Sequence, residues 1–140
     1  MQVPFRNFTQ RLKADGFLAV GGTTGFGYKT GKGVGGAQTQ ITTRATTVVL
    51  NKLCGAITTD TTSLATAAEI SFTVTNSKVA ANDVVVACIK SGGTTSGSTW
   101  AAVTAVADGS FQISLANLHA SVADTGAIVI NFAVIKSSID

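Results

Sequence analysis

The sequence predicts an all-β protein: a jelly-roll-like antiparallel β-sandwich of about eight strands with an extended Gly-rich N-terminal arm. From residue 38 onward, β-branched residues recur with the period-two alternation of strands that bury one face. Turn residues separate these runs at intervals of about 8 to 12 positions, as in sandwiches and small barrels. Nine of the 15 glycines lie between Gly16 and Gly36, a composition that does not form a core by itself. An immunoglobulin-like sandwich gives nearly the same strand pattern, so the topology stays open at this point.

The composition changes after Gly36, and this change divides the chain into an arm, residues 1–36, and a β-sandwich domain, residues 37–140. Charge is also unevenly distributed. Residues 1–44 hold six Lys or Arg and one Asp, a net charge of +5, whereas residues 45–140 hold four Lys or Arg and six Asp or Glu, a net charge of −2. Charged residues make up only 12% of the chain, so its surface is weakly charged and favours association.

The first strands are expected at the start of the domain. Residues 38–43 and 45–50 are predicted to form a strand pair, residues 51–55 to turn the chain, and residues 56–59 to form a short third strand. Residues 61–68 are long enough for a single helical turn.

The middle of the chain alternates most clearly. In residues 69–76, Ile70, Phe72 and Val74 fall on one face and hydroxyl side chains fall on the other, which predicts a strand between core and solvent. Residues 83–90 form a continuous apolar run, which predicts a strand that is buried on both faces.

The C-terminal part begins with a flexible Ser/Thr/Gly loop at residues 91–98. Strands are predicted at residues 99–106 and 111–115, and the Asp108-Gly109 pair between them is a strong signal for a β-hairpin. The last strand is expected at residues 127–136.

Candidate catalytic and cofactor sites lack their full set of residues. Gly31 to Gly36 matches the letters of a dinucleotide-binding loop, but a strand-like run follows where that chemistry needs a helix N-terminus. His119 is the only histidine and is interpreted as a structural residue at a strand end or loop. Most of the acidic residues are explained by turns, namely Asp60, Asp83, Asp108 and Asp124. We therefore expect no enzyme activity, no cofactor and no metal.

Cysteine and tryptophan residues receive structural interpretations. Cys54 and Cys88 are an isolated pair 34 positions apart, which favours buried free thiols over a metal motif or a disulfide. Trp100 is expected in the core at the start of a strand, and the alternative is an exposed platform on which a sugar stacks. The N-terminus lacks the apolar region of a secretion signal and no run is long enough for a membrane span, so we expect assembly in a reducing cytoplasm without a membrane partner.

The arm is the predicted partner-binding segment, because it holds five of the nine aromatic residues in a segment that cannot build its own core. Its cations are dispersed among glycines and aromatics, which disfavours nucleic acid as the partner. Docking between protein subunits is the interpretation that we prefer, and the alternative is an arm that folds back on its own sandwich. The predicted contact residues are Phe5, Arg6, Phe8, Arg11, Lys13, Phe17, Phe26, Tyr28, Lys29 and Lys32.

Several runs of the sequence resemble a β module of structural proteins in tailed bacteriophages. The longest is T-G-K-G-V-G-G-A-Q-T-Q-I-T-T-R-A-T-T-V-V-L-N-K at residues 30–52, and E-I-S-F-T-V-T-N-S at residues 69–77 and I-N-F-A-V-I-K at residues 130–136 are similar. Together with shorter runs, the resemblance covers about residues 28 to 136. In a chain this short, the module is similar to the capsid cement (decoration) proteins of tailed bacteriophages.

This resemblance implies a jelly roll on the outer capsid surface of the virion, assembled in the host cytoplasm. The protein would bridge subunits of the major capsid protein in an HK97-type shell, as a homodimer, and no catalytic residue carries over. Related modules in tail and fibre proteins give an alternative: a tail-fibre or receptor- or glycan-binding β module that uses Trp100 and the loop at residues 92–98.

Overall fold

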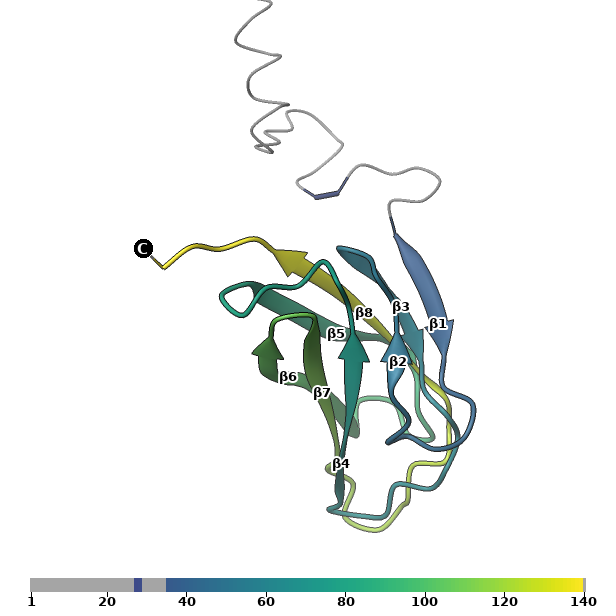
Figure 1. Cartoon of the computed structure of the whole chain (residues 1–140). Helices are drawn as coiled ribbons and strands as arrows, with labels where there is room; N and C mark the ends of the chain where they lie inside the picture. The colour runs from purple at the N-terminus through teal and green to yellow at the C-terminus, as the bar shows by residue number, and fades with distance from the viewer. Residues whose placement is uncertain (1–26, 29–34, 140) are drawn as a thin grey trace, which may run out of the picture.

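The computed structural model describes residues 27–28 and 35–139, and within these residues eight strands form two four-stranded sheets (Figure 1). Sheet A has the strand order β1-β3-β8-β5, and sheet B has the order β2-β4-β7-β6. The predicted eight-stranded β-sandwich is therefore confirmed. The strands are β1 (Gly36–Thr39), β2 (Val48–Val49), β3 (Cys54–Thr58), β4 (Glu69–Thr75), β5 (Val84–Gly92), β6 (Thr99–Ala107), β7 (Ser110–Asn117) and β8 (Ile128–Ile135).

The first two strands do not pair with each other, contrary to the prediction. β1 is parallel to β3 in sheet A and β2 is parallel to β4 in sheet B, so both sheets are mixed, while the other four strand pairs are antiparallel. The chain between β1 and β2 passes from one sheet to the other. The Gln40 side chain holds this crossover by donating hydrogen bonds to the carbonyl oxygens of Arg44, at 3.0 Å, and Thr46, at 2.8 Å. These bonds from the Gln40 side chain thus satisfy backbone carbonyl groups that the expected hairpin would have paired.

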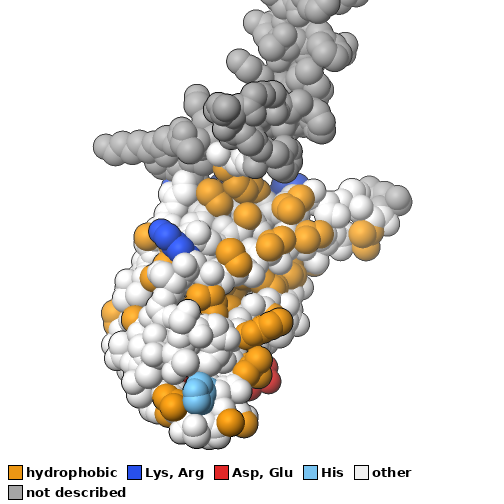
Figure 2. Space-filling view, turned by 180° about the vertical axis from the view of Figure 1, so that it is seen from behind, with side chains coloured by type: hydrophobic (Ala, Val, Ile, Leu, Met, Phe, Trp, Pro, Cys, Tyr) orange, Lys and Arg blue, Asp and Glu red, His pale blue; other side chains and the backbone are white. Residues whose placement is uncertain are grey.

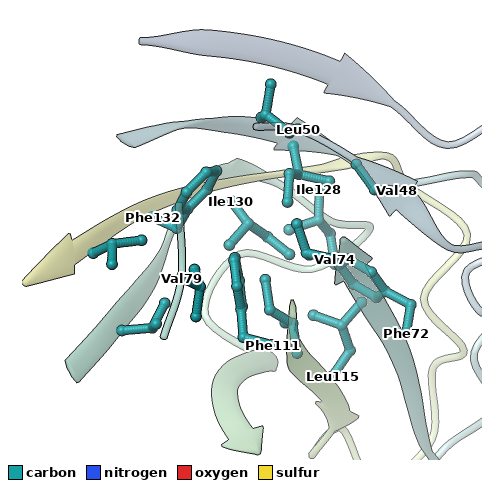
Figure 3. Close-up of a cluster of buried hydrophobic side chains, with 14 of the residues drawn as sticks. Val48, Leu50, Phe72, Val74, Val79, Phe111, Leu115, Ile128, Ile130 and Phe132 are labelled. Atoms are coloured by element: carbon teal, nitrogen blue, oxygen red, sulfur yellow. The ribbon is translucent and has the colours of Figure 1, made fainter. Parts of the chain in front are cut away.

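The core lies between the inner faces of the two sheets (Figure 3). β4 contributes Phe72 and Val74 as its alternation predicted, and Ile70 is partly buried against the same cluster. Phe111 of β7 and Phe132 of β8 meet across the sheets with ring centroids 5.2 Å apart and planes tilted by 50°, a favourable geometry for an aromatic pair. Both sheets thus share one continuous core.

β5 is an edge strand and is not buried on both faces, so this prediction is wrong. Val85 is buried, whereas its neighbours Val84 and Val86 are each about half exposed. The reason is that sheet B covers only the inner face of sheet A. A continuous apolar run in the sequence does not indicate whether one face or both faces of the strand are covered by other elements.

The predicted hairpin joins β6 and β7, with Ala107 paired to Ser110 across Asp108 and Gly109. Gly109 has a φ of +75°, which a residue without a Cβ adopts without strain. The helical turn expected in residues 61–68 is absent; Leu64 instead forms an isolated antiparallel bridge with Asp124. Among the residues that the structure describes, no helix is long and apolar enough to cross a membrane.

Candidate functional site

Of the ten arm residues predicted to bind a partner, Tyr28 alone falls within the described residues. Its side chain is 37% exposed, and burial raises the pKa of its phenol, with smaller contributions from Cys54 and Asp83. Cys54 belongs to β3 of sheet A, and Asp83 is the residue before β5 of the same sheet. The other nine lie outside the described residues: Phe5, Arg6, Phe8, Arg11, Lys13, Phe17, Phe26, Lys29 and Lys32.

The outer face of sheet A, which is turned away from sheet B, is apolar. Its register places Val84 opposite Ile135 and Val86 opposite Ala133, and directly opposite residues in an antiparallel pair share a face. Val84, Val86 and Ile135 are each exposed by 50 or 51%. The view from behind shows hydrophobic side chains in a band across the molecule with few charged ones among them (Figure 2). An exposed apolar face of this kind is typical of a protein-binding surface.

Among the described strands β5 pairs only with β8, so its other edge is free, and this edge borders the apolar face. The strand spans nine residues, and Lys90 is its only charged residue. Natural edge strands are commonly protected by several charges, by proline or by short length. A bulge between Ile89 and Ser91 interrupts the ladder near one end, which leaves the first six residues in regular register with β8. β5 therefore offers a straight edge on which another strand can pair.

Both cysteines are free, as predicted, but they are not buried. Cys54 of β3 is half-buried and Cys88 of β5 is exposed. Cys88 has the same strand parity as Val84 and Val86, so it lies on the outer face of sheet A. The prediction failed because it assumed that β5 is covered on both faces.

The outer face of sheet B differs in chemistry, because hydroxyl and amide side chains cover most of it. Ser71 and Ser114 share a hydrogen bond of 2.6 Å between their Oγ atoms, and the Thr104 hydroxyl lies 2.9 Å from Ser114 Oγ and donates to Gln112 Oε1 at 3.1 Å. These bonds tie three adjacent strands together. The result is a hydrogen-bonded polar surface over these strands, with Val49 of β2 exposed beside Thr75 on the same face.

Trp100 lies at one end of this polar face and is 66% exposed, so its expected position in the core is wrong. The neighbouring Thr99 and Ala101 point toward the core, and Trp100 therefore points outward. A pocket of about 320 Å³ lies beside the loop of residues 92–98 and includes Thr99 in its lining, but Trp100 is not among its lining residues. Trp100 therefore does not line the pocket beside this loop, with which the alternative glycan-binding interpretation had grouped it.

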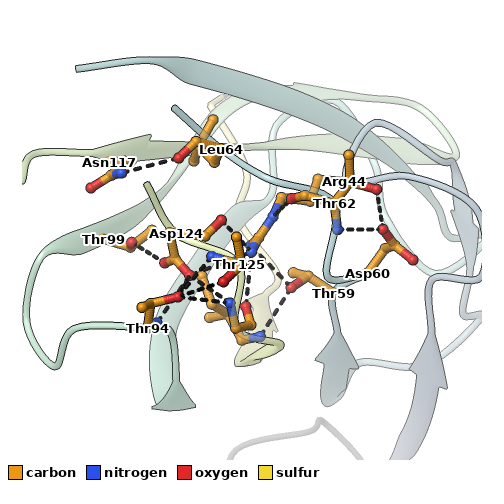
Figure 4. A network of polar contacts seen from close by, with 12 residues as sticks. Arg44, Thr59, Asp60, Thr62, Leu64, Thr94, Thr99, Asn117, Asp124 and Thr125 are labelled. Carbon is orange, nitrogen blue, oxygen red and sulfur yellow. Dashed lines mark hydrogen bonds and ion pairs between the residues drawn. The ribbon is translucent and has the colours of Figure 1, made fainter. Parts of the chain in front are cut away.

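A buried polar network at one end of the sandwich was missed by the sequence analysis (Figure 4). Arg44, which we counted among the cations of residues 1–44, is fully buried. Its guanidinium donates at 2.6 Å to the carbonyl of Thr62 and at 2.8 Å to the carbonyl of Gly126, and it forms an ion pair with Asp124 at 3.4 Å. Arg44 therefore holds loops of the domain together and is not available to a partner.

Asp124 is more than a turn residue, because it is the buried anion of this network. Burial by itself raises the pKa of the carboxyl group. Hydrogen bonds from Thr99, Thr94 and Gly126, together with the charge of Arg44, lower the pKa by more than burial raises it, so the net shift is downward. The carboxylate also holds the backbone N–H groups of Thr94 and Gly126, each at 3.0 Å. It thereby fixes the 92–98 loop to the end of β8.

The remaining candidates have local structural roles, as predicted. His119 accepts hydrogen bonds at Nδ1 from the backbone N–H groups of Ser121 and Val122, at 3.1 and 3.0 Å. Asp108 accepts from Ala81 N–H at 2.8 Å, and Asp83 forms an ion pair with Lys136.

Comparisons with models of known protein families, with curated proteins and with solved structures gave no match. The surfaces described above therefore carry the functional argument by themselves. They are an apolar outer face on sheet A with a free edge at β5, and a polar outer face on sheet B with an exposed Trp100.

Proposed function

We propose that this chain is a structural virion protein that binds the outside of an HK97-type phage capsid and cements neighbouring major capsid subunits. The exposed apolar outer face of sheet A carries the proposal. In a chain with only 12% charged residues, three half-exposed large aliphatic side chains stand together on this face. Such a surface is better suited to burial against protein than to water.

The size of the apolar contact indicates how the protein binds. Complete burial of a Val or Ile side chain yields about 1.5–3 kcal/mol, so covering the exposed half of Val84, Val86 and Ile135 yields about 1 kcal/mol each. A total of about 3 kcal/mol corresponds by itself to binding weaker than about 1 mM. Stable attachment to a shell therefore needs further contacts or linked copies.

Linked copies are available if two chains pair through β5. Antiparallel pairing of two β5 edges joins the two A sheets into one, and places two apolar outer faces side by side on the same surface. Two linked faces bind a repeating capsid surface with a high effective concentration for the second contact. The proposed partners are therefore a second copy of this chain and the major capsid protein.

The experiment is co-sedimentation of the purified protein with shells that lack it. We expect Val86→Lys to reduce occupancy at least tenfold, since a lysine there has to be desolvated on docking. Thr73→Lys is the matched control, because it places the same charge on the opposite sheet. Equal occupancy for both variants refutes the assigned face, and sedimentation of the protein with tails and not with shells refutes the cement function.

The arm is tested separately by deletion of residues 1–34, which leaves β1 intact. The prediction that the arm contacts neighbouring subunits requires that the deletion weaken shell binding while the domain still unfolds cooperatively. Unchanged binding would leave sheet A as the sole docking surface.

A further inference from the structure

The outer face of sheet B contains a row of three residues whose side chains differ in kind. The strand register places Trp100 of β6 opposite Ala116 of β7, and Ala116 opposite Glu69 of β4. Adjacent strands lie about 4.8 Å apart, so the backbones at Trp100 and Glu69 are about 10 Å apart, with Ala116 between them. We call this row the seat, because it places an indole and a carboxylate on one face of the sheet, on either side of a small residue.

The next rows of the same face continue the seat with hydroxyl groups. Ser114 lies two residues before Ala116 on β7, and it shares hydrogen bonds with Ser71 and Thr104. Ser114 is buried and Ser71 is partly buried, whereas Thr104 is exposed, so the Thr104 hydroxyl is the one of the three most open to a ligand. A ligand that rests on the indole thus meets polar partners on the floor beside it.

Folding does not explain an exposed tryptophan at this position. Trp100 is 66% exposed, although the adjacent positions Thr99 and Ala101 show that the strand has an inner face where an aromatic ring could be buried. Leu118, which continues β7 on the same face, is also 62% exposed, and a large aromatic surface left in water is typical of a contact site. Its surroundings then identify the chemistry of the ligand.

We propose that the outer face of sheet B binds a neutral pyranose unit of a glycan, stacked on Trp100. A pyranose ring has an apolar C–H face that fits the indole and peripheral hydroxyl groups that fit Glu69 and the Ser/Thr floor. Glu69 is the only charged residue in the four strands of sheet B, so the site repels anionic sugars. A protein partner fits less well, since the core of a protein interface gathers several large apolar side chains and only Leu118 is added to Trp100 in the adjoining row.

This site does not depend on the proposed capsid function, because it lies on the opposite outer face of the sandwich from the apolar face of sheet A. A single stacked sugar is expected to bind with a Kd on the order of 1–100 mM, equivalent to about −1.4 to −4.1 kcal/mol. Many copies on one surface would raise the avidity for a dense glycan layer.

The test uses the tryptophan itself, since the full-length chain contains only one. The protein is titrated with the methyl glycosides of galactose, glucose and mannose and with N-acetylglucosamine, to roughly 100 mM each, and the emission and iodide quenching of Trp100 are measured. We expect a saturable emission shift and protection from iodide with at least one neutral sugar. No saturable change with any of the four overturns the proposal.

Variants separate stacking from non-specific effects, and ligand-observed saturation-transfer NMR replaces fluorescence for chains without the tryptophan. Trp100→Ala should abolish the NMR signal and leave the melting temperature unchanged, whereas Ile135→Ala on sheet A should leave binding intact. Glu69→Gln should improve binding of N-acetylneuraminic acid relative to the neutral sugars. Binding that survives Trp100→Ala, loss of folding in that variant, or a preference of the wild-type chain for the anionic sugar each overturns the proposal.

Discussion

Replacement of Arg44 by alanine should destabilise the domain more than any exposed charge substitution. The Arg44 side chain is 1% exposed and donates to three carbonyl oxygens, those of Thr62, Asp124 and Gly126, at 2.6, 3.1 and 2.8 Å. Its NH2 group also lies 3.4 Å from Asp124 Oδ1, whose carboxylate is equally buried. Alanine removes all of these contacts together.

The expected cost follows from what remains buried after the change. Breaking a buried ion pair by removal of one partner costs about 3–5 kcal/mol, because the other charge stays desolvated without compensation. Asp124 keeps its bonds from Thr94, Thr99 and Gly126, which places the expected loss at the lower end, about 3 kcal/mol. For a domain near 100 residues this corresponds to a fall in melting temperature of roughly 12 °C or more, out of a total stability of about 5–15 kcal/mol.

The assay is equilibrium urea unfolding followed by circular dichroism, with Lys136→Ala as the matched control. Lys136 also pairs with a buried aspartate, Asp83, but its own side chain is 57% exposed, so its loss should cost less than about 1 kcal/mol. The double variant of Arg44 and Asp124 should show a coupling energy of about 0.5–3 kcal/mol. If Arg44→Ala costs no more than Lys136→Ala, the buried network does not hold the loops as described.

Three further outcomes are expected. Gly92→Ala should destabilise the fold far more than Gly97→Ala, as measured by thermal melts of the two variants. Both glycines have a positive φ, at +97° and +77°. A Cβ at Gly92 collides with the carbonyl oxygen of Ala127, whereas a Cβ at Gly97 meets open space. Because the folded-state pKa of Asp124 is lowered, the stability that its carboxylate contributes is complete well above the unfolded pKa of about 3.9 and is lost as pH falls through the folded value. Urea midpoints should therefore decline below about pH 5. A constant midpoint down to about pH 2 would contradict the assignment. Cys88 lies at the centre of β5, so if two β5 edges pair centre to centre, mild oxidation should form a Cys88 disulfide between two copies. The disulfide-linked dimer would be seen on a non-reducing gel and would be lost in Cys88→Ser. A gel that shows only monomers would argue against this register.

The parts of the fold that local sequence determines were predictable. Phe72 and Val74 alternate with hydroxyl residues, and Asp108-Gly109 supplies the turn geometry of a hairpin, so neither depends on distant parts of the chain. The partners of the first two strands were not predictable in this way. β1 and β2 each pair in parallel with a strand that comes later in the chain, so each pairing needs a connection that crosses over. A short segment of sequence contains no signal for such a crossover between sheets.

Arg44 shows why a buried charge escapes such reasoning. In the sequence it was one more cation in the net charge of residues 1–44, while its actual counter-ion is Asp124, 80 positions away. One signal was present: an isolated arginine within Thr- and Val-rich strand material, with few acidic neighbours in sequence, needs a partner from elsewhere if it is buried. Such a signal predicts that a partner exists without indicating which residue it is.

Trp100 was misplaced for a different reason, which is the bulge in β6. Trp100 and Val106 are an even number of positions apart, so in a regular strand both would point the same way. Because Val106 faces the core, as Phe111 does after the turn, Trp100 would then face the core too. The register shift between Val103 and Ala105 reverses the parity, and Val103 and Val106 both face the core while Trp100 faces out. One extra residue in the strand thus moves the largest side chain of the domain from the core to the surface.

The two outer faces of the sandwich impose opposite requirements on their surroundings. Val84, Val86 and Ile135 gain free energy when water is removed, whereas the hydroxyl ladder of Ser71 and Ser114 is already satisfied and loses little by staying wet. A protein that docks through one face only will therefore choose sheet A. The polar face of sheet B then points away from the docking surface, which is the orientation in which an exposed tryptophan remains available to a soluble ligand.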